Sequence, residues 1–375
     1  MSSSDTFRIL HVMRTPIGGL FRHVLDLARE QAARGHAVGI IADSSTGGKS
    51  AADALATLEP SLKLGLSRVA MSRQVGRRDR SALRHVTECA RQSNVDVLHG
   101  HGAKGGAYAR LAGGPALRVY TPHGGSLFFS PYTPVGLAYF AIERWLRRRT
   151  DLALFESEFA ERTFQRFIGK PPFARVVHNG ITRADLIPVE PDIDAADFIF
   201  MGELRWRKGV DVMLDALGRL AAVGWSGRAI FYGEGPDRAA FEARAGDLGL
   251  LHQVHFAGKS DPRPAFRSGR LLIVPSRQES LPYMVLEAAA ARMPVITTTV
   301  GGIAEIFGPD AGALVPPGDV DALFAAIKRM HGEGDPELVR RLHARVAKFF
   351  TVETMTEAIL TAYRDARAAK SAKAN

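Results

Sequence analysis

The chain repeats one pattern almost from end to end, in which a short apolar run is followed by a turn and a longer helical stretch. In the first half, the runs that we interpret as strands cover residues 8–13, 37–42, 96–99, 117–120 and 152–155. Strands separated by helical segments indicate parallel β-α-β units, so the pattern predicts an α/β fold.

The pattern starts again after a stretch rich in Pro and Asp at residues 187–197. The second series of strands is expected at residues 198–201, 229–232, 254–256, 271–274 and 295–297. A length of 375 residues also exceeds what one core usually organises. We predict two domains, residues 1–188 and 189–350, and a C-terminal helix over 351–375 that packs back toward the first domain. Ligands of such sheets bind beyond the carboxyl ends of the strands, so a cleft between facing domains is the expected site.

The composition limits the kinds of site and the location that we expect. Cys89 is the single cysteine, so the chain can form neither an internal disulfide nor a cysteine-rich metal site, which suits a reducing compartment. No apolar run approaches the roughly 20 residues that span a bilayer, and the start of the chain lacks the features of a signal peptide. We expect a cytoplasmic protein that is soluble or peripheral on the membrane.

The excess of positive charge lies in one half of the chain. The 49 Lys and Arg exceed the 39 Asp and Glu, which gives a formal net charge of +10. Residues 1–188 hold 26 basic and 15 acidic residues, whereas residues 189–375 hold 23 and 24. This asymmetry predicts that the two halves have different partners.

The strongest local motif lies between residues 275 and 296, where a strand ends in a loop and a helix follows. Glu279 is expected in the loop and Glu287 near the start of the helix. Both carboxylates can face a ligand at the helix N-terminus, where backbone N–H groups cradle phosphate and carboxylates accept hydrogen bonds from sugar hydroxyls. In the alternative interpretation, Glu279 is solvated and Glu287 complements the helix dipole.

With this motif the sequence resembles the retaining glycosyltransferases of family 4, whose E-x7-E motif is matched by Glu279 and Glu287. The resemblance extends over nearly the whole chain, through further motifs that keep the family's order. They are Gly18-Gly-Leu-Phe-Arg-His23, Val177-His-Asn-Gly-Ile181, Gly202-Glu-Leu-Arg-Trp-Arg-Lys-Gly209, Gly233-Glu-Gly-Pro236 and Phe256-Ala-Gly258. The resemblance implies the GT-B fold, in which two Rossmann-like domains face each other across a cleft.

The resemblance also implies roles for residues that would bind a nucleotide-sugar donor. The family's equivalent of Glu287 holds the nucleotide ribose, that of Glu279 contacts the donor sugar, and that of Lys208 neutralises the diphosphate. Gly258 lies in a donor-side loop, and Gly19 matches a glycine that lets the backbone approach phosphate or sugar closely.

Two departures from the family pattern affect the donor site. Pro282 has no N–H, so backbone contacts to phosphate are expected from Ser280, Leu281 or the residue after the proline. Many members have an arginine directly after the first glycine of the 202–209 loop, where this chain has Glu203.

Two nearby arginines are candidates to replace the missing cation. Arg205 and Arg207 lie close enough to Glu203, and we favour Arg205 as the second cation beside the diphosphate. Alternatively, both arginines are solvated and Lys208 acts alone.

Three histidines lie where predicted strands of the first domain end, His99, His101 and His123. His99 and His101 share one face of an extended segment, a spacing that also suits a metal. No nearby Asp, Glu or Cys completes a ligand set, and the resembled family is generally metal-independent, so we expect no metal site and no cofactor. His123 matches the family histidine that faces the transferred sugar, which makes it a candidate catalytic residue with a positioning role. A structural histidine in a loop is the alternative.

Two basic segments point to an acidic acceptor or an anionic membrane surface. Residues 71–84 include Arg77, Arg78 and Arg80, and residues 137–149 join apolar and aromatic residues to a basic end, as an interfacial helix would. The apolar residues of 137–149 suit a core at least as well. Nucleic acid is not an expected partner, because the sequence shows no interleaved aromatic motif, zinc spacing or recognition helix.

These features together with the resemblance predict a glycosyltransferase of the hexosyltransferase type, and the resemblance implies that it retains the anomeric configuration. It would move a sugar from a UDP- or GDP-sugar to a hydroxyl of a saccharide or lipid-linked acceptor, in polysaccharide or glycolipid assembly. The candidate catalytic residues are His123, Lys208 and Glu279, and same-face displacement suits them better than a covalent intermediate. Two alternatives stay open, a catalytically silent nucleotide-sugar-binding protein that docks on a membrane or a partner, and a GT-B sugar-nucleotide epimerase.

Overall fold

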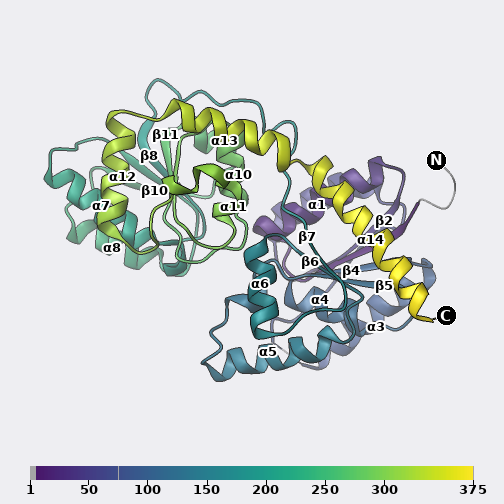
Figure 1. The fold of residues 1–375 in the computed structure, drawn as a ribbon. Coiled ribbons are helices and arrows are strands. Elements are labelled where there is room, and N and C mark those ends of the chain that lie inside the picture. The colour runs from purple at the N-terminus through teal and green to yellow at the C-terminus, as the bar shows by residue number, and fades with distance from the viewer. Residues whose placement is uncertain (1–5, 75, 375) are drawn as a thin grey trace. The chain divides into compact units, whose positions relative to one another are not determined.

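The chain folds into two α/β units, which the computed structural model describes for residues 6–74 and 76–374. Unit 1 comprises residues 1–180 and 352–375, and unit 2 comprises residues 181–351. In each unit the paired strands run parallel and form one sheet with helices beside it (Figure 1). The predicted α/β class with two parallel-sheet domains is confirmed.

Unit 1 contains a seven-stranded sheet in the order β3-β2-β1-β4-β5-β6-β7. The strands are β1 (Arg8–Met13), β2 (Ala37–Asp43), β3 (Leu66–Val69), β4 (Val97–His101), β5 (Leu117–Thr121), β6 (Leu152–Phe155) and β7 (Ala174–Val176). The helices are α1 (Gly18–Ala33), α2 (Gly48–Leu58), α3 (Arg77–Gln92), α4 (Gly102–Leu111), α5 (Pro134–Arg147), α6 (Glu158–Phe167) and α14 (Val352–Ala374), with 3₁₀ turns η1 (Glu59–Ser61) and η2 (Gly125–Phe128). Because β1 lies between β2 and β4, the sheet grows outward from β1 on both sides, as in doubly wound folds.

Both faces of this sheet are covered, which explains why its strands are continuous apolar runs. Ile9 and Leu10 are neighbours in β1, so their side chains point to opposite faces. Ile9 belongs to a core cluster with Leu27 of α1 and residues of α14, whereas Leu10 belongs to a cluster with Val86 of α3 and Tyr108 of α4. The unit therefore has three layers, with the sheet in the middle.

The edge strands β3 and β7 were not among the predicted strands. Every residue of β3 is only half-buried, and the middle residue of β7 is exposed. An edge strand is packed less completely than a central one, so its sequence need not be a continuous apolar run.

The C-terminal helix α14 is an integral part of unit 1. Its residues Met355, Ile359, Leu360 and Tyr363 are at most 2% exposed and join the core cluster that contains strand residues of β1, β4, β5 and β6. The Tyr363 hydroxyl also lies 2.7 Å from Nδ1 of a buried histidine of β4. The chain thus returns to its first unit after completing the second.

Unit 2 contains a five-stranded sheet in the order β10-β9-β8-β11-β12. The strands are β8 (Ala196–Met201), β9 (Ala229–Tyr232), β10 (Val254–Gly258), β11 (Gly269–Val274) and β12 (Val295–Thr297). The helices are α7 (Val210–Ala222), α8 (Arg238–Asp247), α9 (Pro262–Arg267), α10 (Tyr283–Ala290), α11 (Ile303–Phe307), α12 (Val320–Gly332) and α13 (Pro336–Phe349), with 3₁₀ turns η3 (Trp206–Lys208) and η4 (Gly308–Ala313). All strands that we predicted for this half are present.

The division between the units falls at residues 180 and 181, whereas we expected a boundary at 188 and 189. Ile181 is fully buried in a core cluster of unit 2, and Leu186 and Val189 pack against the same cluster. The backbone N–H of Val189 also donates to the carbonyl of Ala291. The Pro-rich stretch is therefore held on unit 2 over much of its length.

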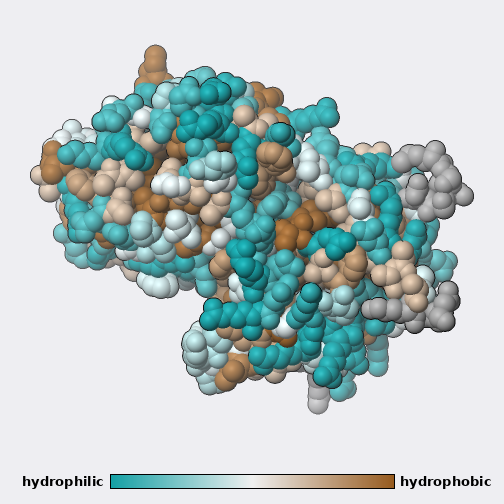
Figure 2. Space-filling model, in the orientation of Figure 1, coloured by the Kyte–Doolittle hydropathy of each residue, from teal (hydrophilic) through white to brown (hydrophobic). Residues whose placement is uncertain are grey.

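No helix in the described ranges combines the length and the apolar character that a membrane crossing would need. The surface in view mixes hydrophilic and hydrophobic residues, and hydrophobic residues reach it over α5 (Figure 2). In α5, Leu137, Ile142 and Trp145 are 54%, 47% and 49% exposed, whereas Phe140 and Leu146 are buried. The apolar residues of this helix are thus divided between the core and the surface.

The packing of α14 makes a prediction for the stability of unit 1. Leu360→Ala removes a side chain that is 1% exposed and should lower the free energy of unfolding by about 2–5 kcal/mol in urea denaturation. The neighbouring Thr361 is exposed, so Thr361→Ala serves as the control and should stay within about 0.5 kcal/mol of the parent. Equal stability of the two variants would show that α14 does not contribute to the core.

Candidate active site

The residues that we singled out in unit 2 gather at the carboxyl ends of its strands. Lys208 follows β8, Gly258 ends β10, and Glu279 follows β11. Parallel strands bring their carboxyl ends to the same edge of a sheet, so residues far apart in sequence meet there. The structure brings Lys208 and Glu279 into direct contact, which no local sequence spacing required.

Lys208 and Glu279 form an ion pair at the centre of this edge. Lys208 Nζ lies 2.5 Å from Glu279 Oε1, and the Ser276 hydroxyl donates to the same oxygen at 2.7 Å. The side chains of the pair are 20% and 10% exposed, so solvent screens their attraction only in part. A lysine at the last position of η3 and a glutamate five residues after β11 thus provide adjacent opposite charges on a partly open surface.

Arg277 connects the loop that carries Lys208 to the loop that carries Glu279. It was not among the residues predicted from the sequence. Its guanidinium makes a bidentate pair with Asp211 at 2.6 Å for both bonds and donates to the carbonyl of Trp206. Its backbone N–H donates to the carbonyl of Arg207. The guanidinium carbon also lies 4.5 Å from the centre of the Trp206 ring. Since planar bidentate pairs hold a fixed geometry, Arg277 positions Lys208 relative to Glu279.

Glu203 is the partner of both arginines that we considered for the diphosphate. Arg205 Nε donates to Glu203 Oε1 at 3.0 Å, and an Arg207 nitrogen donates to Glu203 Oε2 at 2.8 Å. Partial burial acts to raise the pKa of Glu203, but the hydrogen bonds and charges of the two arginines outweigh it and lower that pKa. Glu203 thus stays ionised and holds both cations beside the Lys208 loop.

Close backbone contacts between loops at this edge demand glycine at two positions. Gly209 has φ of +70°, and a Cβ there would collide with the carbonyl oxygen of Pro275. Gly301 has φ of +61°, and a Cβ there would collide with the carbonyl of Glu279. The loops after β8, β11 and β12 therefore touch through their backbones. The N–H of Gly233 donates to the carbonyl of Gly258 and joins two further loops to them.

The remaining donor candidates lie just before α10 or within it. Pro282 is the N-cap of this helix, and Glu287 lies in its second turn with 6% exposure, rather than near its start as expected. Leu281 is buried, and the carbonyl of Ser280 accepts a bond from the N–H of Gly302. Glu279 and Glu287 are thus both largely buried, so Glu279 is not the solvated carboxylate of the alternative interpretation, and Glu287 lies beyond the first turn, where a carboxylate would complement the helix dipole.

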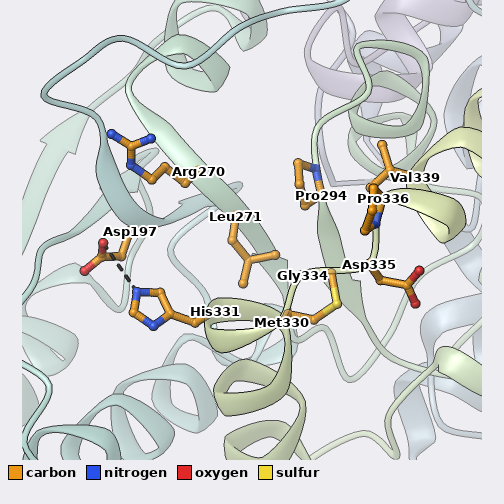
Figure 3. A pocket seen from close by; sticks show the side chains of 10 residues that line it. All are labelled: Asp197, Arg270, Leu271, Pro294, Met330, His331, Gly334, Asp335, Pro336 and Val339. Carbon is orange, nitrogen blue, oxygen red and sulfur yellow. Dashed lines mark ion pairs between the residues drawn. The ribbon is translucent and has the colours of Figure 1, made fainter.

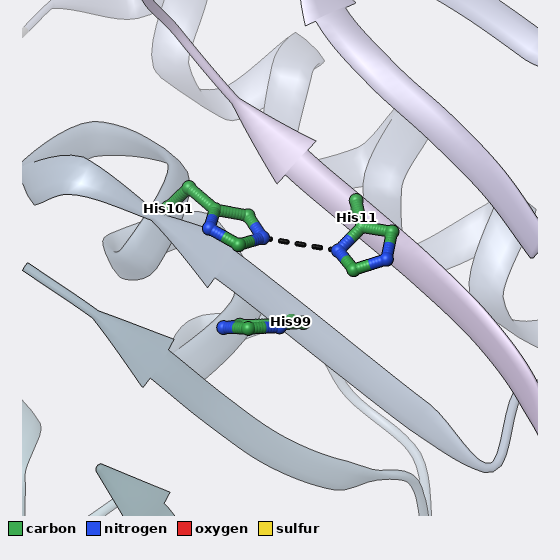
Figure 4. A group of neighbouring side chains, drawn as sticks. All are labelled: His11, His99 and His101. Atoms are coloured by element: carbon green, nitrogen blue, oxygen red, sulfur yellow. Dashed lines mark hydrogen bonds between the residues drawn. The ribbon is translucent and has the colours of Figure 1, made fainter. Parts of the chain in front are cut away.

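Unit 1 holds a cluster of five histidines at the carboxyl ends of its own central strands. The cluster members, each buried or half-buried, are His11, His23, His99, His101 and His123. Three of them come from β1 and β4, as Figure 4 shows for His11, His99 and His101. His99, His101 and His123 were among the candidates predicted from the sequence, whereas His11 and His23 were not.

The two histidines that were missed have different origins in the sequence. His11 lies inside a strand whose apolar neighbours marked it as core, whereas His23 closes the Gly-Gly motif at residues 18–23. His23 Nδ1 lies 3.0 Å from Oδ1 of Asn179, which belongs to the motif at residues 177–181. Two motifs that are 156 residues apart thus meet in one hydrogen bond.

Burial keeps the cluster uncharged. It lowers the pKa of His11 and of His23 to about 4, in each case against a hydrogen bond that acts to raise it. Burial, with the nearby imidazoles as the second cause, also lowers the pKa values of His99, His101 and His123 well below 6.5. All five are therefore neutral at pH 7, each with one N–H and one lone pair.

A chain of hydrogen bonds decides which nitrogen carries the proton in three of these rings. The oxygen of Gln31 lies 2.8 Å from His11 Nε2 and can only accept, so His11 donates there. His11 Nδ1 then accepts from His101 Nε2 at 3.0 Å, and His101 Nδ1 accepts from His123 Nε2 at 3.0 Å. His101 thus turns a lone pair toward His123.

His123 and Gly19 have backbone positions that suit a binding surface. His123 lies two residues after β5 with φ of +52°, which is uncommon for a residue with a side chain. Gly19 is exposed in the first turn of α1. Strained backbone often accompanies function, so its presence at His123 agrees with a functional role.

The basic candidates lie elsewhere in unit 1. Arg77, Arg78 and Arg80 occupy the first turn of α3, and Arg78 and Arg80 are exposed; the side chain of Arg77 lies outside the described part of the structure. Positive charge at a helix N-terminus opposes the helix dipole. Asp79 in the same turn complements the dipole and accepts a hydrogen bond from the N–H of Gly76.

A pocket of about 410 Å³ in unit 2 lies at the opposite edge of the sheet from the donor candidates (Figure 3). Its lining includes Asp197, Arg270 and Pro294, which stand at or just before the amino ends of β8, β11 and β12. His331 Nε2 lies 3.5 Å from an Asp197 oxygen within it. Ligands of parallel sheets bind at the carboxyl edge, so this pocket is separate from the site described above.

Comparison with known proteins identifies the family of the chain. The family model described as Glycosyltransferase Family 4 matches residues 17–184, and the model described as Glycosyl transferases group 1 matches residues 195–333. A Bacillus subtilis protein that carries the name glycosyltransferase EpsD is 30% identical over 302 residues, which cover 72% of this chain and 77% of that protein.

Two further relatives extend the comparison to other bacteria and to structure. The lipopolysaccharide core biosynthesis glycosyltransferase LpsE of Rhizobium meliloti is 28% identical over 60% of this chain and 66% of its own length. The crystal structure of Anabaena HepE in complex with UDP and glucose has a TM-score of 0.80 at 17% identity, and covers 96% of this chain and 100% of that one. The chain belongs to the family 4 glycosyltransferases and has the GT-B fold.

The contact between loops at Gly209 makes a prediction for the stability of unit 2. Gly209→Ala places a Cβ in a left-handed conformation and against Pro275, and should cost about 2–4 kcal/mol of unfolding free energy in urea. Gly249 has nearly the same φ, +71°, with no atom within 4 Å of an added Cβ, so Gly249→Ala should cost about 1 kcal/mol. If the two variants lost equal stability, the close contact between the loops would be absent in solution.

Proposed function

We propose that unit 2 binds a nucleotide diphosphate sugar, a UDP- or GDP-sugar, through the Lys208–Glu279 pair. The observation that carries this proposal is the 2.5 Å contact between these side chains at the carboxyl edge of the sheet. A lysine ammonium suits a diphosphate, and a carboxylate suits the hydroxyls of a sugar. One pair of adjacent residues thus matches the two halves of such a donor. The complex of HepE with UDP and glucose supports this choice of donor class.

The other donor candidates have roles that follow from their positions. Glu287, largely buried in α10, accepts hydrogen bonds from the ribose hydroxyls, and Arg205 is the second cation for the diphosphate. Lys208 and Arg205 together neutralise the negative charge of the diphosphate, which a divalent metal neutralises in other enzymes. We therefore propose that transfer requires no metal or other cofactor. Glu203 holds Arg205 until the phosphate competes for it.

We propose that transfer retains the configuration at the anomeric carbon by same-face displacement. The acceptor oxygen bonds to the anomeric carbon as the bond from that carbon to the diphosphate oxygen breaks, and the hydroxyl proton passes to the diphosphate. Lys208 and Arg205 stabilise the negative charge on the leaving group. His123 positions the transferred sugar by hydrogen bonding, since burial keeps it neutral and it need not act as a nucleophile.

We propose that unit 1 binds the acceptor, at a membrane surface on the cytoplasmic side. The exposed Leu137, Ile142 and Trp145 of α5 lie on a helix that also carries basic residues, the composition of an interfacial helix. The basic first turn of α3 adds attraction to anionic lipid. The names of LpsE and similar relatives support a saccharide or lipid-linked acceptor in polysaccharide or glycolipid assembly.

Turnover of a Lys208 variant tests this proposal. Thermal-shift screening with UDP-, GDP- and ADP-sugars first identifies the donor, and release of the nucleoside diphosphate then measures transfer. Lys208→Ala removes a charge beside the leaving group and should lower kcat about 100–1000-fold. Lys328→Ala, which replaces an exposed lysine of α12, is the control and should leave turnover unchanged.

Two further measurements test the other parts of the proposal. Glu287→Gln should weaken donor binding, and EDTA should not inhibit the parent protein.

Two outcomes would contradict the donor assignment. Unchanged transfer by the Lys208 variant would remove that residue from the mechanism, and no stabilisation by any nucleotide sugar would remove the donor site. Donor binding without turnover across a broad acceptor set would instead favour a catalytically silent binding protein.

Sedimentation with vesicles tests the membrane proposal. Replacing Arg77, Arg78 and Arg80 together by Gln should weaken binding to vesicles rich in anionic lipid about 100-fold, because each basic residue near such a surface contributes about 1 kcal/mol. Binding to vesicles of neutral lipid should change little.

The control removes the same charge from unit 2. Lys328, Arg329 and Lys348 are exposed, and replacing all three by Gln should leave vesicle binding unchanged. An equal loss in both triple variants would mean that net charge, and not the first turn of α3, governs the binding.

A further inference from the structure

We propose that His23, His101 and His123 of unit 1 form a binding site for a transition-metal ion, with Zn²⁺ as the best-matched ion. The site is separate from the donor residues of unit 2, and its occupation is not required for the transfer reaction proposed above. The proposal departs from the sequence-based expectation of no metal site, which considered no ligand set that included His23.

The spacing of the ring nitrogens suits a metal. Among the described residues, one nitrogen from each of these three rings lies within 4.8 Å of the others. His101 Nδ1 and His123 Nε2 are already 3.0 Å apart. Zinc–nitrogen bonds of 2.0–2.1 Å in a tetrahedron require nitrogens about 3.3 Å apart, so small rotations of the rings complete the site.

Two of the three rings offer a lone pair on the nitrogen available to a metal. His23 donates from Nδ1 to Asn179, which leaves a lone pair on Nε2, and that buried nitrogen has no hydrogen-bond partner among the described residues. The hydrogen-bond chain from Gln31 leaves the Nδ1 lone pair of His101 directed at His123. A metal ion would take the place of the proton between His101 and His123, and His123 would then carry its proton on Nδ1.

The surroundings resemble those of known metal sites, in which a ligand histidine donates its other N–H to a fixed acceptor. His23 donates to Asn179 Oδ1 at 3.0 Å, and His101 donates to His11 Nδ1 at 3.0 Å. His23 and His101 are 2% and 1% exposed, whereas His123 is only half-buried and leaves a route for an ion and for a fourth ligand.

The second group of three histidines does not share these properties. His11, His99 and His101 also lie within reach of one another (Figure 4). Both nitrogens of His11 and both of His99 are occupied by hydrogen bonds, to His101, Gln31, Tyr363 and Thr121. Within the described part of the chain, this group therefore has no nitrogen comparable to His23 Nε2, which makes no hydrogen bond, and its role is to orient His101.

The donor set determines the class of metal. Three neutral imidazoles with an open fourth position are typical of zinc, and imidazole also suits copper and nickel. Mg²⁺ and Ca²⁺ prefer oxygen ligands and are not expected here.

Calorimetric titration with ZnCl₂ tests the proposal. The full-length chain, without a histidine tag and stripped with EDTA, should bind one Zn²⁺. His23→Gln and His123→Gln should each weaken this binding at least about 10-fold. His255 is exposed on unit 2, and His255→Gln should bind as the parent does. His123→Gln is the more informative variant, because its half-buried site tolerates substitution better than the buried His23.

Cobalt provides a second measurement that does not depend on the variants' stability. Co²⁺ bound to the parent should show the visible absorption of a tetrahedral site with nitrogen ligands, and ZnCl₂ should abolish it. The proposal would be overturned if the chain bound much less than one ion. It would also be overturned if His23→Gln and His123→Gln both left the binding intact. An octahedral Co²⁺ spectrum would also overturn it.

A bound ion would have a consequence for catalysis that rests on the function proposed above. His123 cannot both bind the metal and position the sugar, so Zn²⁺ should inhibit transfer and EDTA should reverse the inhibition. Zinc binding without inhibition would contradict the role of His123 in transfer, and would leave the metal site itself established by calorimetry.

Discussion

The parallel pairing of the strands is the constraint on which the rest of this structure depends. It brings every loop that follows a strand to one edge of its sheet, whatever the distance along the chain. In unit 2 this edge joins Lys208 to Glu279, which are 71 residues apart. In unit 1 it brings His101 next to His123, and His23 of α1 next to both. The histidine cluster and the donor candidates are thus products of the same topology.

Opposite charges at the edge of unit 2 are matched before any ligand binds. Lys208 pairs with Glu279, Arg277 with Asp211, and Arg205 with Glu203. Unpaired cations crowded into adjoining loops would repel one another, and the carboxylates prevent this. In the donor complex that we propose, the diphosphate replaces these carboxylates as the anionic partner of Lys208 and Arg205. The glutamate that departs from the family pattern therefore has a clear electrostatic role beside two arginines.

Much of the fold was predictable from the sequence because buried central strands need continuous apolar runs. All five expected strands of unit 2 are present, whereas the half-buried edge strands β3 and β7 of unit 1 gave no comparable pattern. Site residues inside motifs were also found, such as Glu279. Arg277 lies in the same motif but was missed, because its partner Asp211 stands in the first turn of α7, 66 residues away. His11 was missed because an apolar strand around it indicated only core.

The sequence by itself determined the two parallel-sheet domains, the family, and which residue types stand at the strand ends. These follow from local patterns, since apolar periodicity and turn residues act over a few positions. Only the tertiary structure decided that His11 and His23 complete a histidine cluster, that Asn179 orients His23, and that α14 belongs to unit 1. Those contacts join residues that are far apart in the chain. Their geometry comes from how strands and helices pack, which no local pattern encodes.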